Sequence, residues 1–160
     1  MQASNEGPIE RLNTPARISV GILGAVGLVG IVLQTFNLSL FGVFPLLSNR
    51  YYYLLIGIFL AAAFLLLPPR TGAMQMRVNL VDWALAALAL ASGIYFAINA
   101  ELILTQGWDV VAPTTAAAVS IVMVLLSLEA LRRSGGTLLL VICAFFATYP
   151  LFAEHMPGFL

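Results

Sequence analysis

Charged residues are scarce in this sequence. Only 9% of its 160 residues are charged, whereas 61% are hydrophobic. Ordinary soluble domains carry about 25% charged and about 45–50% apolar residues. This chain therefore has too few polar side chains to cover a water-soluble surface, and its composition predicts an integral membrane protein.

Lysine is absent, and the seven basic residues are all arginine, balanced by seven acidic residues. A chain with zero net charge has no basic patch for nucleic acid. Cysteine and histidine occur once each, as Cys143 and His155, so the chain can build neither a disulfide framework nor a Cys/His metal site. We expect a buried apolar role for Cys143, a surface position for His155, and no cofactor.

Catalytic motifs are also missing. The sequence has no glycine-rich phosphate loop, no carboxylate pair at an obvious spacing, and no serine or cysteine with a base near it. We therefore do not expect an enzyme.

Apolar runs dominate what remains. A helix of about 20 residues crosses a hydrocarbon core of about 30 Å. The uncharged runs predict an all-α membrane protein, a bundle of about five transmembrane helices near residues 18–35, 51–67, 81–100, 114–132 and 137–153. Residues 1–17 are polar and are predicted to form a tail, and 101–113 a polar connection.

The last two runs are separated by the segment from Ser127 to Gly136, which predicts a helical hairpin. Glu129 stands three and four residues before Arg132 and Arg133, so a helix places these charges on one face. We expect a structural ion pair at the membrane boundary, because an unpaired carboxylate at mid-bilayer costs about 3 kcal/mol. Ser134, Gly135 and Gly136 are predicted to end the helix and reverse the chain.

Aromatic residues near the ends of the runs predict anchors at the membrane interface, where rings with one polar end are favoured. These residues are Tyr51, Tyr52, Tyr53, Trp83 and Trp108. An aromatic belt is favoured over a ligand site.

Asp82 lies at the start of the third run, where a carboxylate is stabilised by the positive end of the helix dipole. Capping is favoured over proton or ion handling.

Glycine punctuates the first run at Gly21, Gly24, Gly27 and Gly30. Gly21 and Ala25 form a small-xxx-small pair that suits close helix packing in lipid, although glycine that is simply tolerated in a membrane helix fits equally well.

Arginine distribution predicts the orientation. With a cytoplasmic N-terminus, the outside segments hold Arg50 alone, and the inside segments hold Arg11, Arg17, Arg70, Arg77, Arg132 and Arg133. Because basic residues favour the cytoplasmic side, we expect the N-terminus inside and the C-terminus outside.

Several motifs resemble, in order, the N-terminal part of fused permeases of tripartite ATP-independent periplasmic (TRAP) transporters, of the kind served by TAXI-type binding proteins. The resemblance covers about 80–160, with a weaker match at Phe41-Gly42 and Asn49–Leu55. Its main motifs are Asp82–Ala86, Ala100–Leu104, Ala112–Thr115, Leu128–Arg133 and Tyr149–Gly158.

This resemblance implies a scaffold in a bacterial inner membrane. In that family, four N-terminal helices form a small, Q-like region beside a large, M-like region, which carries the solute and sodium sites. Residues 18–133 would be the Q-like region, and residues 134–160 a connecting helix and the start of the large region. The resemblance thus implies a truncated or split permease, with sodium coupling only in the absent part.

Two functions remain open from the sequence. The first is this scaffold, whose partners would be the large permease region or subunit, a periplasmic TAXI-type solute-binding protein and the lipid bilayer. The second is a membrane protein that assembles or anchors partners without transport. Nothing in the chain identifies a solute.

The predicted orientation can be tested by cysteine labelling in intact cells. We expect Asp109→Cys to react with an impermeant thiol reagent and Gly72→Cys to be protected, because position 109 lies in an outside segment and position 72 in an inside segment. Protection at 109 together with labelling at 72 would reverse the orientation.

Overall fold

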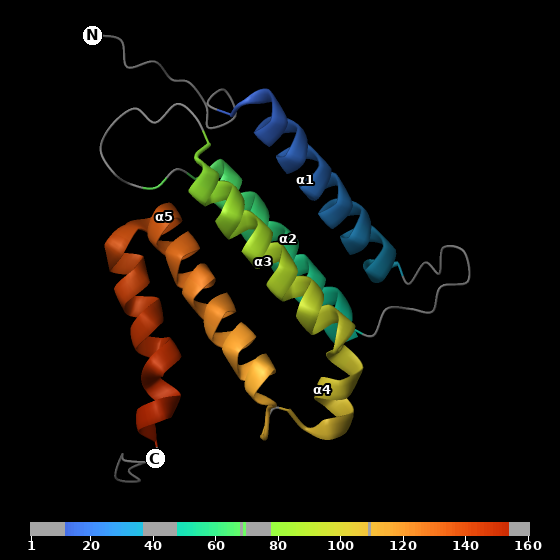
Figure 1. The fold of residues 1–160 in the computed structure, drawn as a ribbon, viewed down its shortest axis with the longest axis vertical. Coiled ribbons are helices and arrows are strands. Elements are labelled where there is room, and N and C mark those ends of the chain that lie inside the picture. Colours follow the sequence, from blue (N-terminus) through green and yellow to red (C-terminus); the bar gives the residue numbers. More distant parts are fainter. Residues whose placement is uncertain (1–11, 37–47, 68, 70–77, 109, 154–160) are drawn as a thin grey trace.

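The computed structural model describes residues 12–36, 48–67, 69, 78–108 and 110–153, and these residues form an all-helical bundle (Figure 1). Its helices are α1 (Thr14–Thr35), α2 (Ser48–Leu66), α3 (Leu80–Ile98), α4 (Ala100–Gln106) and α5 (Thr114–Ala153). Within the described ranges, α1, α2, α3 and α5 are each long and apolar enough to cross a membrane. The architecture agrees with the predicted all-α class.

Two helices begin earlier than predicted. Helix α1 starts at Thr14, so the predicted tail 1–17 is too long; its residues 1–11 lie outside the described part. Pro15 fits the first helical turn, where a missing N–H removes no intrahelical bond. Helix α2 starts at Ser48, which places Arg50 and the tyrosines that follow it inside its first turns.

The predicted connection 101–113 contains a helix. Helix α3 ends at Ile98, and Asn99 closes it by donating from Nδ2 to the Tyr95 carbonyl at 2.8 Å. Helix α4 follows because Ile103 buries its side chain, and it ends at Gly107, which adopts a left-handed φ of 65°. Asp109 lies outside the described residues.

Helix α5 contains both of the last predicted spans. Its two limbs run in opposite directions and meet at Gly136 (Figure 1). Gly136 has φ 81° and ψ −176°, a backbone conformation that is essentially confined to glycine. The expected stop over 134–136 is therefore narrower than predicted, because Ser134 and Gly135 remain helical and a single residue reverses the chain.

The centre of the bundle is the antiparallel pair of α2 and α3, which cross at two glycines. A Cβ added to Gly93 would lie 2.8 Å from the Cα of Gly57 and 2.8 Å from the Tyr53 carbonyl oxygen. Small residues at a crossing let two backbones approach closely, which is a main source of helix association in lipid. Gly57 and Gly93 thus set the spacing of the pair.

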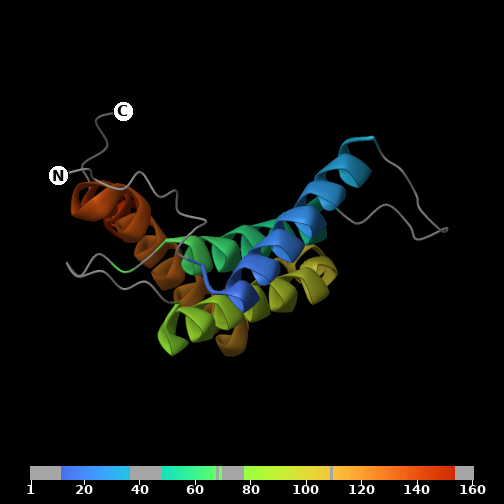
Figure 2. The same ribbon diagram turned by 90° about the horizontal axis from the view of Figure 1, so that it is seen from above.

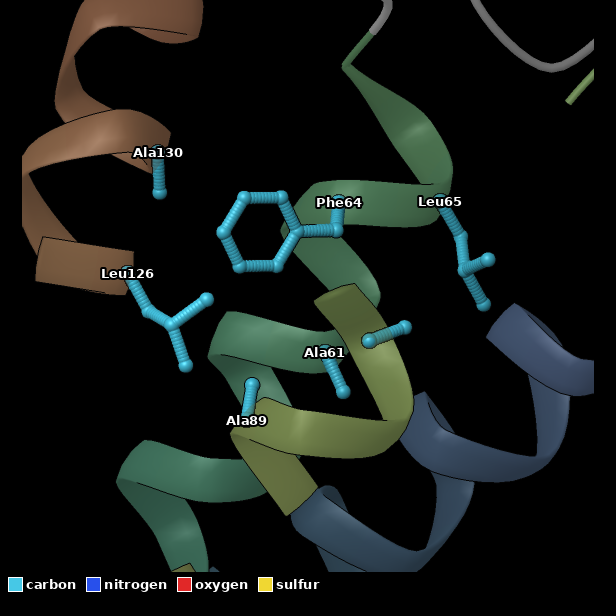
Figure 3. Close-up of a cluster of buried hydrophobic side chains, with 7 residues drawn as sticks. Ala61, Phe64, Leu65, Ala89, Leu126 and Ala130 are labelled. Atoms are coloured by element: carbon cyan, nitrogen blue, oxygen red, sulfur yellow. The ribbon is translucent and has the colours of Figure 1, made fainter. Parts of the chain in front are cut away.

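A small apolar core joins α2 and α3 to the first limb of α5. Figure 3 shows Phe64 of α2 pointing toward Leu126 and Ala130 of α5, with alanines filling the space between the helices. Phe64 is 1% exposed, because the small side chains of the surrounding alanines leave room for its ring between the helices. The buried cluster consists of Ala61, Phe64, Leu65, Ala86, Ala89, Leu126 and Ala130.

Helix α1 lies along α2 at the edge of the bundle (Figures 1 and 2). Gly27 is buried there, and a Cβ at this position would meet the Phe59 ring at 3.3 Å. Gly21 and Ala25 are exposed, and nothing lies within 4 Å of a Cβ added to Gly21. The small-residue pair expected at 21 and 25 is therefore not the packing contact of α1 in the described structure.

Gly93→Ala should destabilise the bundle by about 1–3 kcal/mol, because its Cβ would overlap the α2 backbone, which has no flexible end to move aside. The free energy of unfolding of the purified protein in detergent measures this. Gly24→Ala is the matched control, since nothing lies within 4 Å of its added Cβ. Equal stability losses for the two variants would contradict a close α2–α3 crossing.

Candidate functional site

A charged cluster lies at the end of the bundle where α2 ends, α3 begins and α5 reverses. It consists of Asp82, Glu129, Arg132 and Arg133. These four residues make the ion pairs found among the described residues. Because the rest of the described interior is largely apolar, the cluster is the candidate functional site.

Asp82 completes the N-terminal cap of α3. Its Oδ2 accepts from the backbone N–H of Asn79 at 3.2 Å, and the Asn79 side chain accepts from the backbone N–H of Leu80 at 2.7 Å. These bonds satisfy N–H groups that have no partner inside the helix, which is the capping role favoured from the sequence. Asp82 keeps its second oxygen free for a different partner.

That partner is Arg133, from the end of the first limb of α5. Its Nη1 donates to Asp82 Oδ1 at 2.7 Å and to the carbonyl of Leu67, at the end of α2, at 3.2 Å. Its guanidinium lies 5.1 Å from the centre of the Phe64 ring, within range of a cation–π contact. One side chain of α5 therefore holds both the end of α2 and the start of α3.

Glu129 connects the two arginines within α5. Arg132 donates to both of its oxygens, from Nε to Oε2 and from Nη2 to Oε1, each at 2.7 Å. Arg133 Nε donates to the same Oε1 at 2.9 Å. Glu129 thus forms both ion pairs that its spacing predicts, and it turns the Arg133 guanidinium so that Nη1 points toward α3.

Burial separates a dry half of the cluster from a wet half. The Arg133 and Asp82 side chains are 3% and 6% exposed, whereas Arg132 and Glu129 are 36% and 28% exposed. Buried charges are tolerated when they are paired and fully hydrogen-bonded. Among the described residues, no buried side-chain nitrogen or oxygen lacks a hydrogen-bond partner. The arrangement is a completed electrostatic tie between helices.

The Asp82–Arg133 pair was missed from the sequence. The two residues are 51 positions apart, and no helical spacing relates them. The predicted orientation places Asp82 and Arg133 near the same, cytoplasmic end. It does not indicate which of the six arginines predicted on that side pairs with Asp82.

The predicted interface anchors lie at both ends of the bundle. The Tyr51 and Tyr52 rings are tilted against each other with their centres 5.5 Å apart, and the Tyr53 ring centre lies 5.4 Å from that of Phe96 in α3. Trp83, in the first turn of α3, is half-buried against the apolar core.

Trp108 follows α4 and donates from Nε1 to the Gln106 side chain at 2.9 Å. It also lines the apolar groove, defined as an open space of about 520 Å³ between α2, α3, α4 and the two limbs of α5. Two serines line this groove, but Ser120 donates to the Ala116 carbonyl and Ser127 to the Met123 carbonyl. Cys143 contributes a half-buried thiol from the second limb.

In the part of the chain that the structure describes, no group of three histidine, cysteine, aspartate or glutamate residues could hold a metal ion. His155 and Glu154 lie outside that part. Comparisons of the chain with protein-family models, with curated proteins and with solved structures gave no match.

Arg133→Met should reduce the free energy of unfolding by about 3–5 kcal/mol, because it leaves the Asp82 carboxylate buried without its cation. Arg132→Met, its neighbour on the same helix, should cost only about 0–1 kcal/mol because that arginine is partly exposed. Unfolding of both variants in detergent measures the difference.

A double-mutant cycle with Asp82→Asn identifies the partner. The two substitutions together should cost less than the sum of the single costs, because the second removes the charge that the first leaves unpaired. Additive costs, or equal losses for Arg132→Met and Arg133→Met, would contradict the tie.

Proposed function

We propose that this chain is the scaffold part of a TRAP secondary transporter of the TAXI-served type, in a bacterial inner membrane with its N-terminus in the cytoplasm. In this role it supports sodium-driven uptake of an organic acid-type solute that a periplasmic binding protein delivers. The motif resemblance over about 80–160 supports the family, and the all-helical architecture supports a membrane scaffold.

The main support for the proposal is that the buried charges inside the bundle are paired with each other. Among the described residues, the two most buried charged side chains, Asp82 and Arg133, pair with each other, and Arg133 also donates to a backbone carbonyl. A transport site needs polar groups that are free to exchange partners with solute or ion. Charges that are fully used in joining α2, α3 and α5 are those of a rigid support.

Hydroxyl groups in the helices follow the same pattern. Four of them donate to the carbonyl four residues earlier in their own helix, at 2.7–2.9 Å: Ser92, Ser120, Ser127 and Thr148. Secondary transporters place their sites near the bilayer midplane on interrupted helices, where freed backbone groups coordinate the solute and ion. In the described residues, the interruptions at Asn99 and Gly136 fall at the ends of limbs instead.

The outer faces of the bundle suit lipid or a large apolar partner. Leu138, Val141, Phe145 and Phe146 on the second limb of α5 are 59–75% exposed. In the proposed assembly this limb is the connecting helix, and the large, M-like permease region is the partner that moves against the scaffold.

The alternative is a membrane protein that assembles or anchors partners without transport. The same buried tie and apolar faces would serve it. A downstream reading frame that codes for about ten further apolar spans favours the transporter scaffold, and its absence favours the alternative.

Reconstitution in liposomes tests the proposal. With a sodium gradient and a cognate binding protein, residues 1–160 alone should accumulate no solute above empty liposomes, whereas the same chain together with a large permease region of this family should do so. Each preparation is checked for the amount of protein inserted, so that a failed insertion is not counted as inactivity.

Accumulation by residues 1–160 alone would contradict the scaffold role. Failure of the chain to co-purify with the large region, or to support uptake with it, would favour the alternative function.

A further inference from the structure

Arg50 stands apart from the charged cluster, at the opposite end of the α2–α3 pair. Its Nε donates to the Ala97 carbonyl, in the last turn of α3, at 2.9 Å. A cation is favoured at a helix C-terminus, and the bond fixes the direction of the guanidinium. Within the described ranges, no carboxylate pairs with Arg50 and no residue accepts from its two Nη groups.

Beside this guanidinium, an open groove of about 280 Å³ runs between α2 and α3. It is lined by Arg50, Leu54, Ile94, Ala97 and Ile98. Because the two helices are antiparallel and Arg50 meets Ala97, the next turns place Leu54 opposite Ile94. The groove therefore has a cationic end and an apolar length, and Ile94 and Ile98 are 41% and 69% exposed along it.

Two further features favour an anion at the cationic end. Arg50 is the third residue of α2, where the unpaired backbone N–H groups of the first turn carry partial positive charge. It also precedes Tyr51, Tyr52 and Tyr53, a run of rings of the kind found at headgroup depth. A basic residue at this depth, beside the groove between α2 and α3, is suited to bind a lipid phosphate.

We propose that this groove is a binding site for one anionic phospholipid. The phosphate pairs with the free Nη groups of Arg50, and an acyl chain lies along Leu54, Ile94 and Ile98. The bound lipid fills the α2–α3 groove and stabilises the central pair. This site is independent of the proposed transport role, since it depends only on the α2–α3 pair.

The test uses the full chain, purified in a neutral detergent, with thermal unfolding followed by tryptophan fluorescence. Detergent-solubilised phosphatidylglycerol should raise Tm by about 3–5 °C at saturation, because it binds the folded state alone. Phosphatidylcholine and inorganic phosphate should each produce less than a third of this shift. An equal shift with phosphatidylcholine would overturn the charge recognition, and an equal shift with inorganic phosphate would overturn a lipid as the occupant.

Arg50→Gln should lose at least two thirds of the phosphatidylglycerol shift. Arg17→Gln is the matched control, because it removes an exposed arginine from the first turn of α1 and should keep the full shift. Ile94→Trp keeps Arg50 but fills the apolar part of the groove, so it should also lose the shift, and it decides the matter if Arg50→Gln does not fold. A full shift in Ile94→Trp, or in folded Arg50→Gln, would overturn the proposal.

Discussion

The structure depends on one buried ion pair between helices that are distant in sequence. In a bilayer, lipid tails solvate apolar side chains as well as a neighbouring helix does, so apolar contact alone gives little reason for helices to associate. The Arg133–Asp82 pair supplies a directional contact at 2.7 Å, and the bond from Arg133 to the Leu67 carbonyl adds the end of α2. The Phe64 ring and the small core beneath it then keep water from these charges.

Close backbone approach is the second source of association. Gly57 and Gly93 hold the middle of the α2–α3 pair, while the charged cluster fixes one end and the Arg50 bond to Ala97 fixes the other. Three different contacts thus define the register of a single helix pair. In the described structure, helix α1 and the second limb of α5 make no comparable polar contacts with the other helices. Their exposed apolar faces suit contact with lipid or with other protein.

Features that depend on neighbours in sequence could be predicted, and features that depend on distant residues could not. The apolar runs, the hairpin around Gly136 and the pairing of Glu129 with both arginines follow from run length and helical spacing. Helix α4 was missed because it is short and its two buried residues, Ala100 and Ile103, are buried by tertiary contact rather than by a local pattern. The Gly21–Ala25 pair is also a local pattern, but it does not indicate which face of α1 meets α2. The Phe59 ring of α2 packs against Gly27, and this contact turns Gly21 and Ala25 away from α2.

The separation of Asp82 and Arg133 also orders the assembly of the chain in time. Asp82 is synthesised 51 residues before its cation. Until Arg133 follows, Asp82 lacks this buried cation, and a carboxylate without it is more stable at the membrane surface, where water solvates it. Arrival of the first limb of α5 therefore marks the step at which the start of α3 can be shielded from water. A helix that is synthesised later thus completes the packing of one that was inserted earlier.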